Sequence, residues 1–256
     1  MSETSVVVHA DAAVLAPAVA ARLIVRIVDA QAAQGSAHVV LTGGRVAGAV
    51  LRAIRDSPAA GAIDWSRVDL WWGDERFLPA GDPDRNETQA REALLDALPL
   101  DPARVHPMPP SDGPDGDDAE AAARRYAAEL AAAAGGTGDL PHFDVLMLGV
   151  GEDGHVASIF PGHPVGHGTG TVAAEHDSPK PPPTRTTLTL RAIGTAEEVW
   201  LIAAGKDKAE AVGKAFEGPD PAQLPAAGAT GVRHTRWLLD EAAAVDVPQK
   251  SRTGRQ

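Results

Sequence analysis

One stretch near the middle of the chain constrains the fold more than any other. Residues 143–148, FDVLML, are apolar almost without interruption, so they lack the alternation of a strand with one face in water. Such a run is typical of a strand covered on both faces, as in parallel sheets with helices on either side. Polar residues and glycines follow directly in GVGEDGH. The stretch therefore predicts a buried parallel strand whose carboxyl end leads into a polar loop.

Apolar runs of strand length alternate with helical patterns along the rest of the chain. Further strands are expected at residues 6–8, 38–41, 68–72, 199–203 and 234–239, and helices at residues 11–33, 46–55, 86–97, 118–134 and 208–216. Asn86 is expected to cap the third of these helices, and residues 162–183 are expected to form an extended loop. Residues 186–190, TTLTL, alternate strictly, which favours a half-exposed or antiparallel strand. This rhythm predicts an α/β fold with a doubly wound, mostly parallel sheet and helices on both faces. We expect one domain, with a smaller lobe around residues 75–135.

Composition narrows the class of protein. The 256 residues carry a formal net charge of −12 and include no cysteine, which excludes disulfides, thiolate-held metals and a thiol nucleophile. The negative charge argues against duplex DNA or an anionic membrane as the main partner, since both favour a basic surface. No apolar run approaches the ~20 residues of a membrane span. We therefore expect a cytoplasmic protein that binds a small molecule.

The loops that follow the expected strands are the candidate sites, because ligands of open parallel sheets bind outside the carboxyl ends of the strands. Four loops occupy such positions, at residues 42–44, 74–76, 149–155 and 205–208. Gly43 and Gly44 let backbone N–H groups approach an anion at a helix N-terminus. A bare Gly-Gly pair is more often a plain tight turn, so this signal is informative only together with cations elsewhere.

His155 is the candidate general base, at the expected start of a helix. An imidazole titrates near pH 6.5 and can therefore take a proton from water at working pH. Asp74 and Glu75 are candidate acid or base carboxylates, although a charged turn at a strand end is as often only solvated. Arg76 beside them can pair with these acids or hold a substrate anion.

Cofactor and metal signals are weak. Four histidines at positions 155, 163, 167 and 176 lie close in sequence, but their Gly/Pro-rich loop does not fix tetrahedral zinc geometry. Gly149, Gly151 and Gly154 match the spacing of a dinucleotide fingerprint. However, a Gly/Pro/His loop follows them where that fingerprint has an acid about 20 residues later. These patterns therefore favour neither a zinc site nor a dinucleotide site.

A proline run in SPKPPPTR separates Lys180 from Arg185. The run is either a spacer that ends in an exposed charge or a rigid segment that aims Arg185 at a fixed anion, for which a guanidinium is well shaped. Lys208, at the expected start of a helix after Gly205, is placed to join it.

Five separated blocks occur in an order typical of one family: LTGG, GDERFLP with DPDRN, GVGEDGHVASIFPGHP, SPKPPPTRTTLTL and GKDKA. On these blocks, about residues 38–216, the chain resembles the glucosamine-6-phosphate isomerase/6-phosphogluconolactonase family, and its lactone-hydrolysing members in particular. The resemblance implies a Rossmann-like fold, hydrolysis of 6-phosphogluconolactone in the pentose phosphate pathway, and no metal or cofactor. Residues 1–245 would form the α/β domain of this family, with residues 246–256 as a disordered polar tail.

The resemblance also implies roles for individual residues. It assigns His155 as the general base, Arg76 to a place near the sugar, Thr42, Gly43 and Gly44 to the phosphate loop, and Arg185 and Lys208 to the phosphate. From the residues themselves we add Asp74 as a candidate catalytic acid, and Arg45, Gly151 and Asp153 as candidate substrate or phosphate contacts.

Two points stay open at this stage. The family commonly reads SGGSTP where this chain has TGGRVAG, so hydroxyl donors are lost and Arg45 is expected to compensate by charge. The acid that orients His155 is either Asp74 or Asp153. The oxyanion is expected to be stabilised by backbone N–H groups of residues 149–154 or by Arg76.

Two other functions compete with lactone hydrolysis. A glucosamine-6-phosphate deaminase would use the same phosphate cradle, but those relatives typically read DGHIAFNEP, with a glutamate that this chain replaces by SIFP at residues 158–161. A non-catalytic sugar-phosphate sensor would keep the pocket without needing His155. We expect a monomer with no nucleic-acid partner and no membrane partner.

Overall fold

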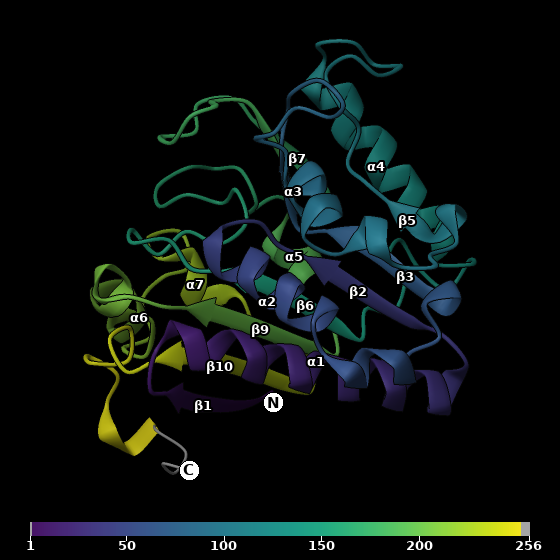
Figure 1. The fold of residues 1–256 in the computed structure, drawn as a ribbon. Coiled ribbons are helices and arrows are strands. Elements are labelled where there is room, and N and C mark those ends of the chain that lie inside the picture. Colours follow the sequence, from purple (N-terminus) through teal and green to yellow (C-terminus); the bar gives the residue numbers. More distant parts are fainter. Residues whose placement is uncertain (1, 252–256) are drawn as a thin grey trace.

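A seven-stranded sheet organises residues 2–251, the part of the chain that the computed structural model describes (Figure 1). Every strand pair in it is parallel, and the spatial order is β1-β10-β9-β6-β2-β3-β5. The strands are β1 (Glu3–His9), β2 (Ala37–Leu41), β3 (Val68–Trp72), β5 (Val105–His106), β6 (Val145–Gly149), β9 (Glu198–Ala203) and β10 (His234–Asp240).

Helices follow most of these strands. They are α1 (Ala12–Gln34), α2 (Arg45–Arg55), α3 (Asn86–Ala93), α4 (Ala119–Ala133), α5 (Leu190–Ile193), α6 (Ala209–Ala215) and α7 (Pro225–Gly228). Short 3-10 turns lie at Pro58–Ala62, Trp65–Arg67, Leu95–Ala97, Pro102–Arg104, Lys206–Lys208 and Gln249–Ser251. Figure 1 shows α1 and α2 side by side across one face of the sheet.

The ends of α1 are fixed by local signals in the sequence. The Asp11 carboxylate accepts a hydrogen bond of 2.9 Å from the Val14 N–H, and Gly35 closes the helix with a φ of 85°. An acidic N-cap satisfies a free N–H of the first turn, and glycine adopts the left-handed C-terminal conformation without strain. The predicted span of residues 11–33 is therefore confirmed within one or two residues.

The central strand β6 is buried on both faces, as its apolar run predicts. Val145, Leu146 and Leu148 are fully buried and Met147 is 2% exposed. Because successive side chains of a strand point to opposite faces, both faces must be covered. Each such side chain contributes about 1.5–3 kcal/mol of apolar burial. The doubly wound, mostly parallel α/β architecture is confirmed.

A second, antiparallel sheet in the order β4-β8-β7 lies beside the large one. Its strands are β4 (Asp74–Arg76), β8 (Arg185–Leu188) and β7 (Val172–Glu175). The sequence predicted a turn at residues 74–76 and a loop at residues 162–183, so β4 and β7 were missed. The antiparallel nature of the TTLTL segment is confirmed, but its half-exposure is wrong, because Thr186 and Thr187 are fully buried.

The lobe and the C-terminal segment both join the main body. A small apolar cluster packs beneath α4, made of Phe77, Ala119, Ala122, Ala123 and Ala174. Val247 is 3% exposed and belongs to the main core, so the segment predicted as a tail is packed at its start. Residues 252–256 of that predicted tail lie outside the described residues.

No helix within residues 2–251 is long and apolar enough to cross a bilayer.

The chain reverses its direction of winding between β2 and β6. From β2 it continues outward to β3 and β5, whereas β9 and β10 follow β6 on the other side. Such a reversal opens a crevice at the carboxyl ends of the two central strands, where ligands of these folds bind. The loop after β6 carries His155. It contains isolated bridges of Val156 to Val150 and Ile159 in place of the helix start expected there.

Candidate active site

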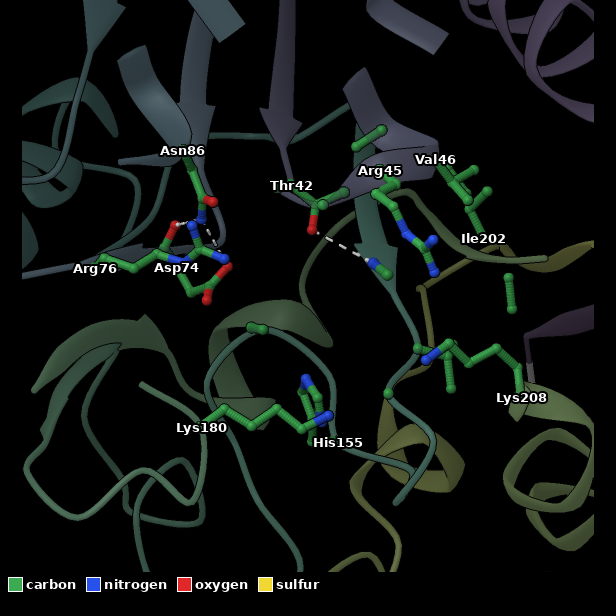
Figure 2. Close-up of a pocket in the computed structure, with 18 of the residues that line it drawn as sticks. Thr42, Arg45, Val46, Asp74, Arg76, Asn86, His155, Lys180, Ile202 and Lys208 are labelled. Atoms are coloured by element: carbon green, nitrogen blue, oxygen red, sulfur yellow. Dashed lines mark hydrogen bonds between the residues drawn. The ribbon is translucent and has the colours of Figure 1, made fainter. Parts of the chain in front are cut away.

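A cavity of about 380 Å³ opens at the carboxyl ends of β2, β6 and β9 and beside β4 (Figure 2). Its volume is within the range of small-molecule sites. The structure brings together at this cavity all the predicted site residues except Asp153: Thr42, Gly43, Gly44, Arg45, Asp74, Arg76, Gly151, His155, Arg185 and Lys208.

Asp153 lies behind His155 and holds its ring. The Nδ1 atom of His155 is 2.5 Å from Asp153 Oδ1, and the His155 N–H donates to the same oxygen at 3.2 Å. Burial raises the pKa of the Asp153 carboxyl, but the hydrogen bond and charge of His155 outweigh it and hold that pKa well below its usual range. An ionised Asp153 accepts a hydrogen bond from the Nδ1–H group of His155, which leaves Nε2 as the basic nitrogen. Between the two acids considered from the sequence, the geometry therefore favours Asp153 as the orienting one.

Gly151 leaves the room that this pair needs. A Cβ at Gly151 would lie 2.0 Å from His155 Nδ1 and 2.5 Å from Asp153 Oδ1. Any side chain there would displace the imidazole or its acid. Glycine is therefore required at this position, because the side chains of Asp153 and His155 approach it closely.

Asp74 is bound by other partners. Its Oδ2 accepts a 2.7 Å hydrogen bond from Ser158 Oγ, and its main-chain oxygen accepts a 2.9 Å bond from Asn86 Nδ2. Asp74 is only 6% exposed but still lines the cavity. These contacts place the Asp74 carboxylate at the cavity wall formed by β4 and Asn86 and tie it to the His155 loop through Ser158. The carboxylate can accept a hydrogen bond from a ligand hydroxyl there.

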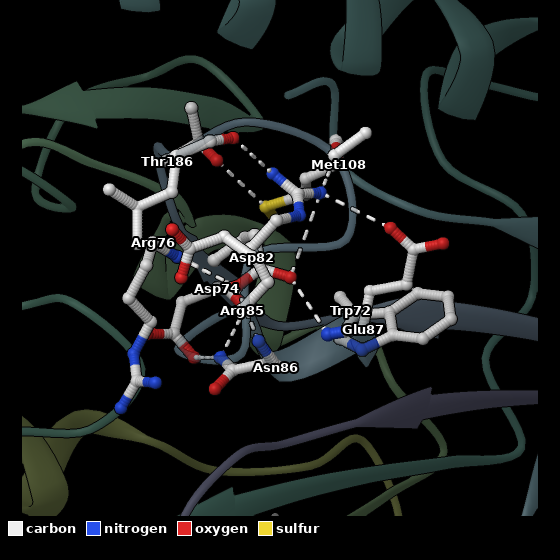
Figure 3. A network of polar contacts seen from close by, with 12 residues as sticks. Trp72, Asp74, Arg76, Asp82, Arg85, Asn86, Glu87, Met108 and Thr186 are labelled. Atoms are coloured by element: carbon white, nitrogen blue, oxygen red, sulfur yellow. Dashed lines mark hydrogen bonds and ion pairs between the residues drawn. The ribbon is translucent and has the colours of Figure 1, made fainter. Parts of the chain in front are cut away.

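A buried network beneath β4 fixes this wall (Figure 3). The Glu75 carboxylate accepts backbone N–H bonds from Asn86, Glu87 and Arg76 at 2.7–2.9 Å. Arg85 is fully buried with Glu75, and their charged groups are 3.8 Å apart. The helix cap expected from Asn86 is wrong, because Asn86 is the first residue of α3 and Glu75 caps the helix instead. Charged residues 74–76 are therefore not a solvated turn.

The other end of the cavity is built around the start of α2. Gly44 precedes the helix without a side-chain cap, so N–H groups of the first turn remain available to an anion. Figure 2 shows Arg45 and Lys208 on this side of the cavity. Thr42 Oγ accepts a 3.3 Å bond from the Gly149 N–H and ties this turn to the loop after β6. A Cβ at Gly43 would lie 1.9 Å from Asn86 Oδ1, so only glycine fits.

Arg76 and Arg185 are neighbours because β4 and β8 pair antiparallel with these residues in register. Arg76 Nη1 donates to the Asp84 carbonyl oxygen. Arg185 is 5% exposed, and its Nε and Nη2 donate to the carbonyl oxygens of Pro182, Pro181 and Lys180 at 3.0–3.1 Å. The guanidinium therefore points inward, which is one of the two alternatives that the sequence left open. Its hydrogen bonds also fix the proline loop.

Three residues of the site were not singled out from the sequence. Asn86 and Lys180 line the cavity, and Ser158 binds Asp74. Asn86 and Lys180 stand within the blocks DPDRN and SPKPPPTR, and Ser158 follows His155 in GHVAS. Their position within the blocks that resemble the family is the sequence feature from which these three site residues could have been identified. No group of three or more potential metal ligands occurs within the described part of the chain.

Comparison with known proteins shows the family of the chain. A model of the family described as glucosamine-6-phosphate isomerases/6-phosphogluconolactonase matches residues 10–237. A Streptomyces coelicolor protein named 6-phosphogluconolactonase is 60% identical over 253 residues, which are 97% of each chain. A Mycobacterium tuberculosis protein of the same name is 48% identical, over 96% of this chain and 99% of its own.

Solved structures give the same result. The 6-phosphogluconolactonase of Trypanosoma brucei has a TM-score of 0.80 and 28% identity, covering 97% of this chain and 100% of its own. A monomeric glucosamine-6-phosphate deaminase, with a TM-score of 0.76, 21% identity and coverage of 94% and 99%, shares the fold. Since the family model and the curated relatives extend over most of its length, the chain belongs to the family of glucosamine-6-phosphate isomerases and 6-phosphogluconolactonases.

Proposed function

We propose that the chain hydrolyses 6-phospho-D-glucono-1,5-lactone to 6-phospho-D-gluconate, with His155 as the general base. The observation that carries this proposal is the arrangement of the cavity. An imidazole with Asp153 on Nδ1 stands at one side, and Arg45, Lys208 and the N-terminus of α2 stand at another. A sugar phosphate extended between them would place its anionic end at the cations and its lactone carbon at the base.

The reaction follows from the free Nε2 of His155. Nε2 takes a proton from water as the water oxygen bonds to C1, and the carbonyl electron pair moves onto the C1 oxygen. When this oxyanion collapses, the bond between C1 and the ring oxygen breaks, and the ring oxygen receives the proton from the imidazolium. No covalent enzyme intermediate is needed, because a δ-lactone is already an activated ester. Backbone N–H groups of residues 149–154 or Arg76 would donate to the developing oxyanion.

Phosphate binding serves mainly to position C1. Arg185 and Lys208 are the cations assigned to the phosphate, and Arg45 supplies charge where the turn lacks hydroxyl donors. Binding energy at the phosphate is then used to hold the lactone in a reactive geometry, so a substrate without phosphate should lose turnover as well as affinity.

A direct assay tests the proposal. The purified chain is mixed with freshly prepared lactone at pH 7, acid release is followed above the spontaneous background, and glucosamine 6-phosphate is tested in parallel for ammonia. Acid release that the His155→Ala variant does not give is the expected result. Ammonia release would support the deaminase alternative, and binding without either reaction would support the sensor alternative.

The protein is further proposed to act as a monomer in the cytoplasm. All residues assigned to the site come from one chain, so no second subunit is needed to complete it. Size-exclusion chromatography with light scattering should give a mass near 26.4 kDa. A stable dimer at assay concentrations would contradict the proposed monomeric state.

A further inference from the structure

The cations that line the cavity differ in what holds them. Arg45 and Lys208 stand at the α2 end (Figure 2). Arg76 donates to the Asp84 carbonyl oxygen, and Arg185 donates to three carbonyl oxygens of the proline loop. Lys180 is the remaining cation among the described residues that line this space, and it lies on the side of His155.

The backbone of Lys180 is fixed on both sides. Its N–H donates to Ser178 Oγ at 3.2 Å, and its carbonyl oxygen accepts from Ser178 Oγ at 2.8 Å and from Arg185 Nη2 at 3.0 Å. A held backbone limits the space that the side chain can reach, so Lys180 has less conformational freedom to lose when its ammonium contacts a ligand in the cavity. Figure 2 shows the side chain of Lys180 extending toward the His155 ring.

The ammonium is only loosely paired. Its nearest carboxylate is Glu152 at 3.7 Å, and the two side chains are 37% and 61% exposed. An exposed pair of this kind contributes little and exchanges readily. Burial raises the pKa of the Asp153 carboxyl, the contacts with His155 lower it by more, and the Lys180 charge lowers it further. Lys180 is therefore within electrostatic reach of the His155–Asp153 pair.

We propose that Lys180 is a further catalytic residue: its ammonium stabilises the negative charge that forms on the C1 oxygen when water adds, and then binds the C1 carboxylate of the product. This role rests on the lactonase function proposed above. A lactone is neutral at C1 whereas the oxyanion and the product are negative, so a cation beside the base favours both over the substrate.

The first test separates turnover from binding. Lys180→Met removes the charge at similar length, and Lys206→Met removes the same charge from an exposed lysine that does not line the cavity. We expect kcat to fall about 10- to 100-fold in Lys180→Met, with KM changed less than threefold. This loss of kcat is smaller than that for a rigid oxyanion donor, because the Lys180 side chain is partly exposed. Lys206→Met should retain wild-type kcat, and Lys180→Arg should restore most of the loss.

The second test does not depend on turnover. Calorimetry compares 6-phosphogluconate with glucitol 6-phosphate, two ligands that differ at C1 by a carboxylate against a hydroxymethyl group. In Lys180→Met the affinity for 6-phosphogluconate should fall about 10-fold, the lower end of the range for one charged hydrogen bond, because this side chain is partly exposed. The affinity for glucitol 6-phosphate should stay within twofold.

The outcomes separate this inference from the proposed function. A wild-type chain without lactonase activity would overturn both. An active wild type whose Lys180→Met variant keeps its kcat, or loses affinity equally for both ligands, would overturn the role of Lys180 alone. Failure of Lys180→Arg to restore activity in a folded protein would show that Lys180 acts by shape and not by charge.

Discussion

The two acidic regions beside the cavity are held in opposite ways. In the loop after β6, Asp153 contacts His155 only two residues away, and the side chains are 33% and 17% exposed. Beneath β4, Glu75 and Arg85 are fully buried, and Glu75 binds residues of α3 more than ten positions away. The first region keeps a titratable base open to substrate. The second region is buried, and it fixes the wall that carries Asp74 and Arg76.

Removal of the base should give the largest effect on activity and almost none on stability. His155→Ala is expected to lower kcat by about 10²- to 10⁴-fold, the usual contribution of a general base. Its thermal unfolding midpoint should stay near that of the wild type, because its polar contacts are local and partly exposed. Steady-state kinetics and calorimetry check both parts, with His176→Ala as the control at an exposed histidine. Near wild-type turnover would remove His155 from the mechanism.

Breaking the buried pair should do the reverse, with loss of stability as its main effect. At pH 8, where Glu75 is ionised, Arg85→Met leaves it buried without its countercharge, and removal of one partner of such a pair costs about 3–5 kcal/mol of unfolding free energy. Urea unfolding measures this directly. The control is Arg91→Met, which breaks a partly exposed pair with Glu87 on α3 and should cost about 1 kcal/mol or less. Equal costs for the two variants would show that burial of Arg85 does not matter.

The third change addresses the residue that connects the two regions. Arg185→Ala is expected to weaken substrate or product binding by about 1.5–3 kcal/mol, or roughly 10- to 150-fold. Arg185→Lys keeps the charge but cannot bridge the three carbonyl oxygens of residues 180–182. If the phosphate contact dominates, the lysine variant retains most of the affinity, and if the loop contact dominates, both variants lose it. Unchanged KM in Arg185→Ala would refute the phosphate assignment.

The same contrast explains what the sequence could predict. The Gly151–Asp153–His155 unit and the ends of α1 depend on contacts a few residues apart, so their spacing encodes them directly. Ser158 meets Asp74 across 84 positions, and Arg76 meets Arg185 through the β4–β8 register. Such contacts depend on how strands pair, which a single sequence does not specify. For this reason β4 was expected to be a turn and Asn86 a cap, whereas the order of strands was enough to predict that these loops meet around a cavity at the carboxyl ends of the strands.

The last prediction concerns pH, where the expected change for each pH unit is smaller than the effects above, and it isolates the buried carboxyl. Burial raises the pKa of Glu75 to about 7, although Arg85 and three backbone N–H groups oppose this rise. Between pH 4.5, its ordinary value, and about 7, the folded chain therefore holds a proton that the unfolded chain has released. The Glu75 contribution to the unfolding free energy then falls by about 1.4 kcal/mol for each pH unit of increase in this window.

Glu75→Gln separates that contribution from those of other titrating groups. The glutamine has no proton to release, so the difference in unfolding free energy between wild type and variant should change with pH between 5 and 7 and level off above about 7.5. Urea unfolding in half-unit pH steps measures this difference. Asp115→Asn is the matched variant at a surface carboxyl, whose pKa the hydrogen bonds from Arg125 hold below its usual value, so its difference from wild type should stay constant over the same range. A constant difference for Glu75→Gln as well would mean that Glu75 is ionised throughout this range, and burial would then not be what distinguishes the two acids.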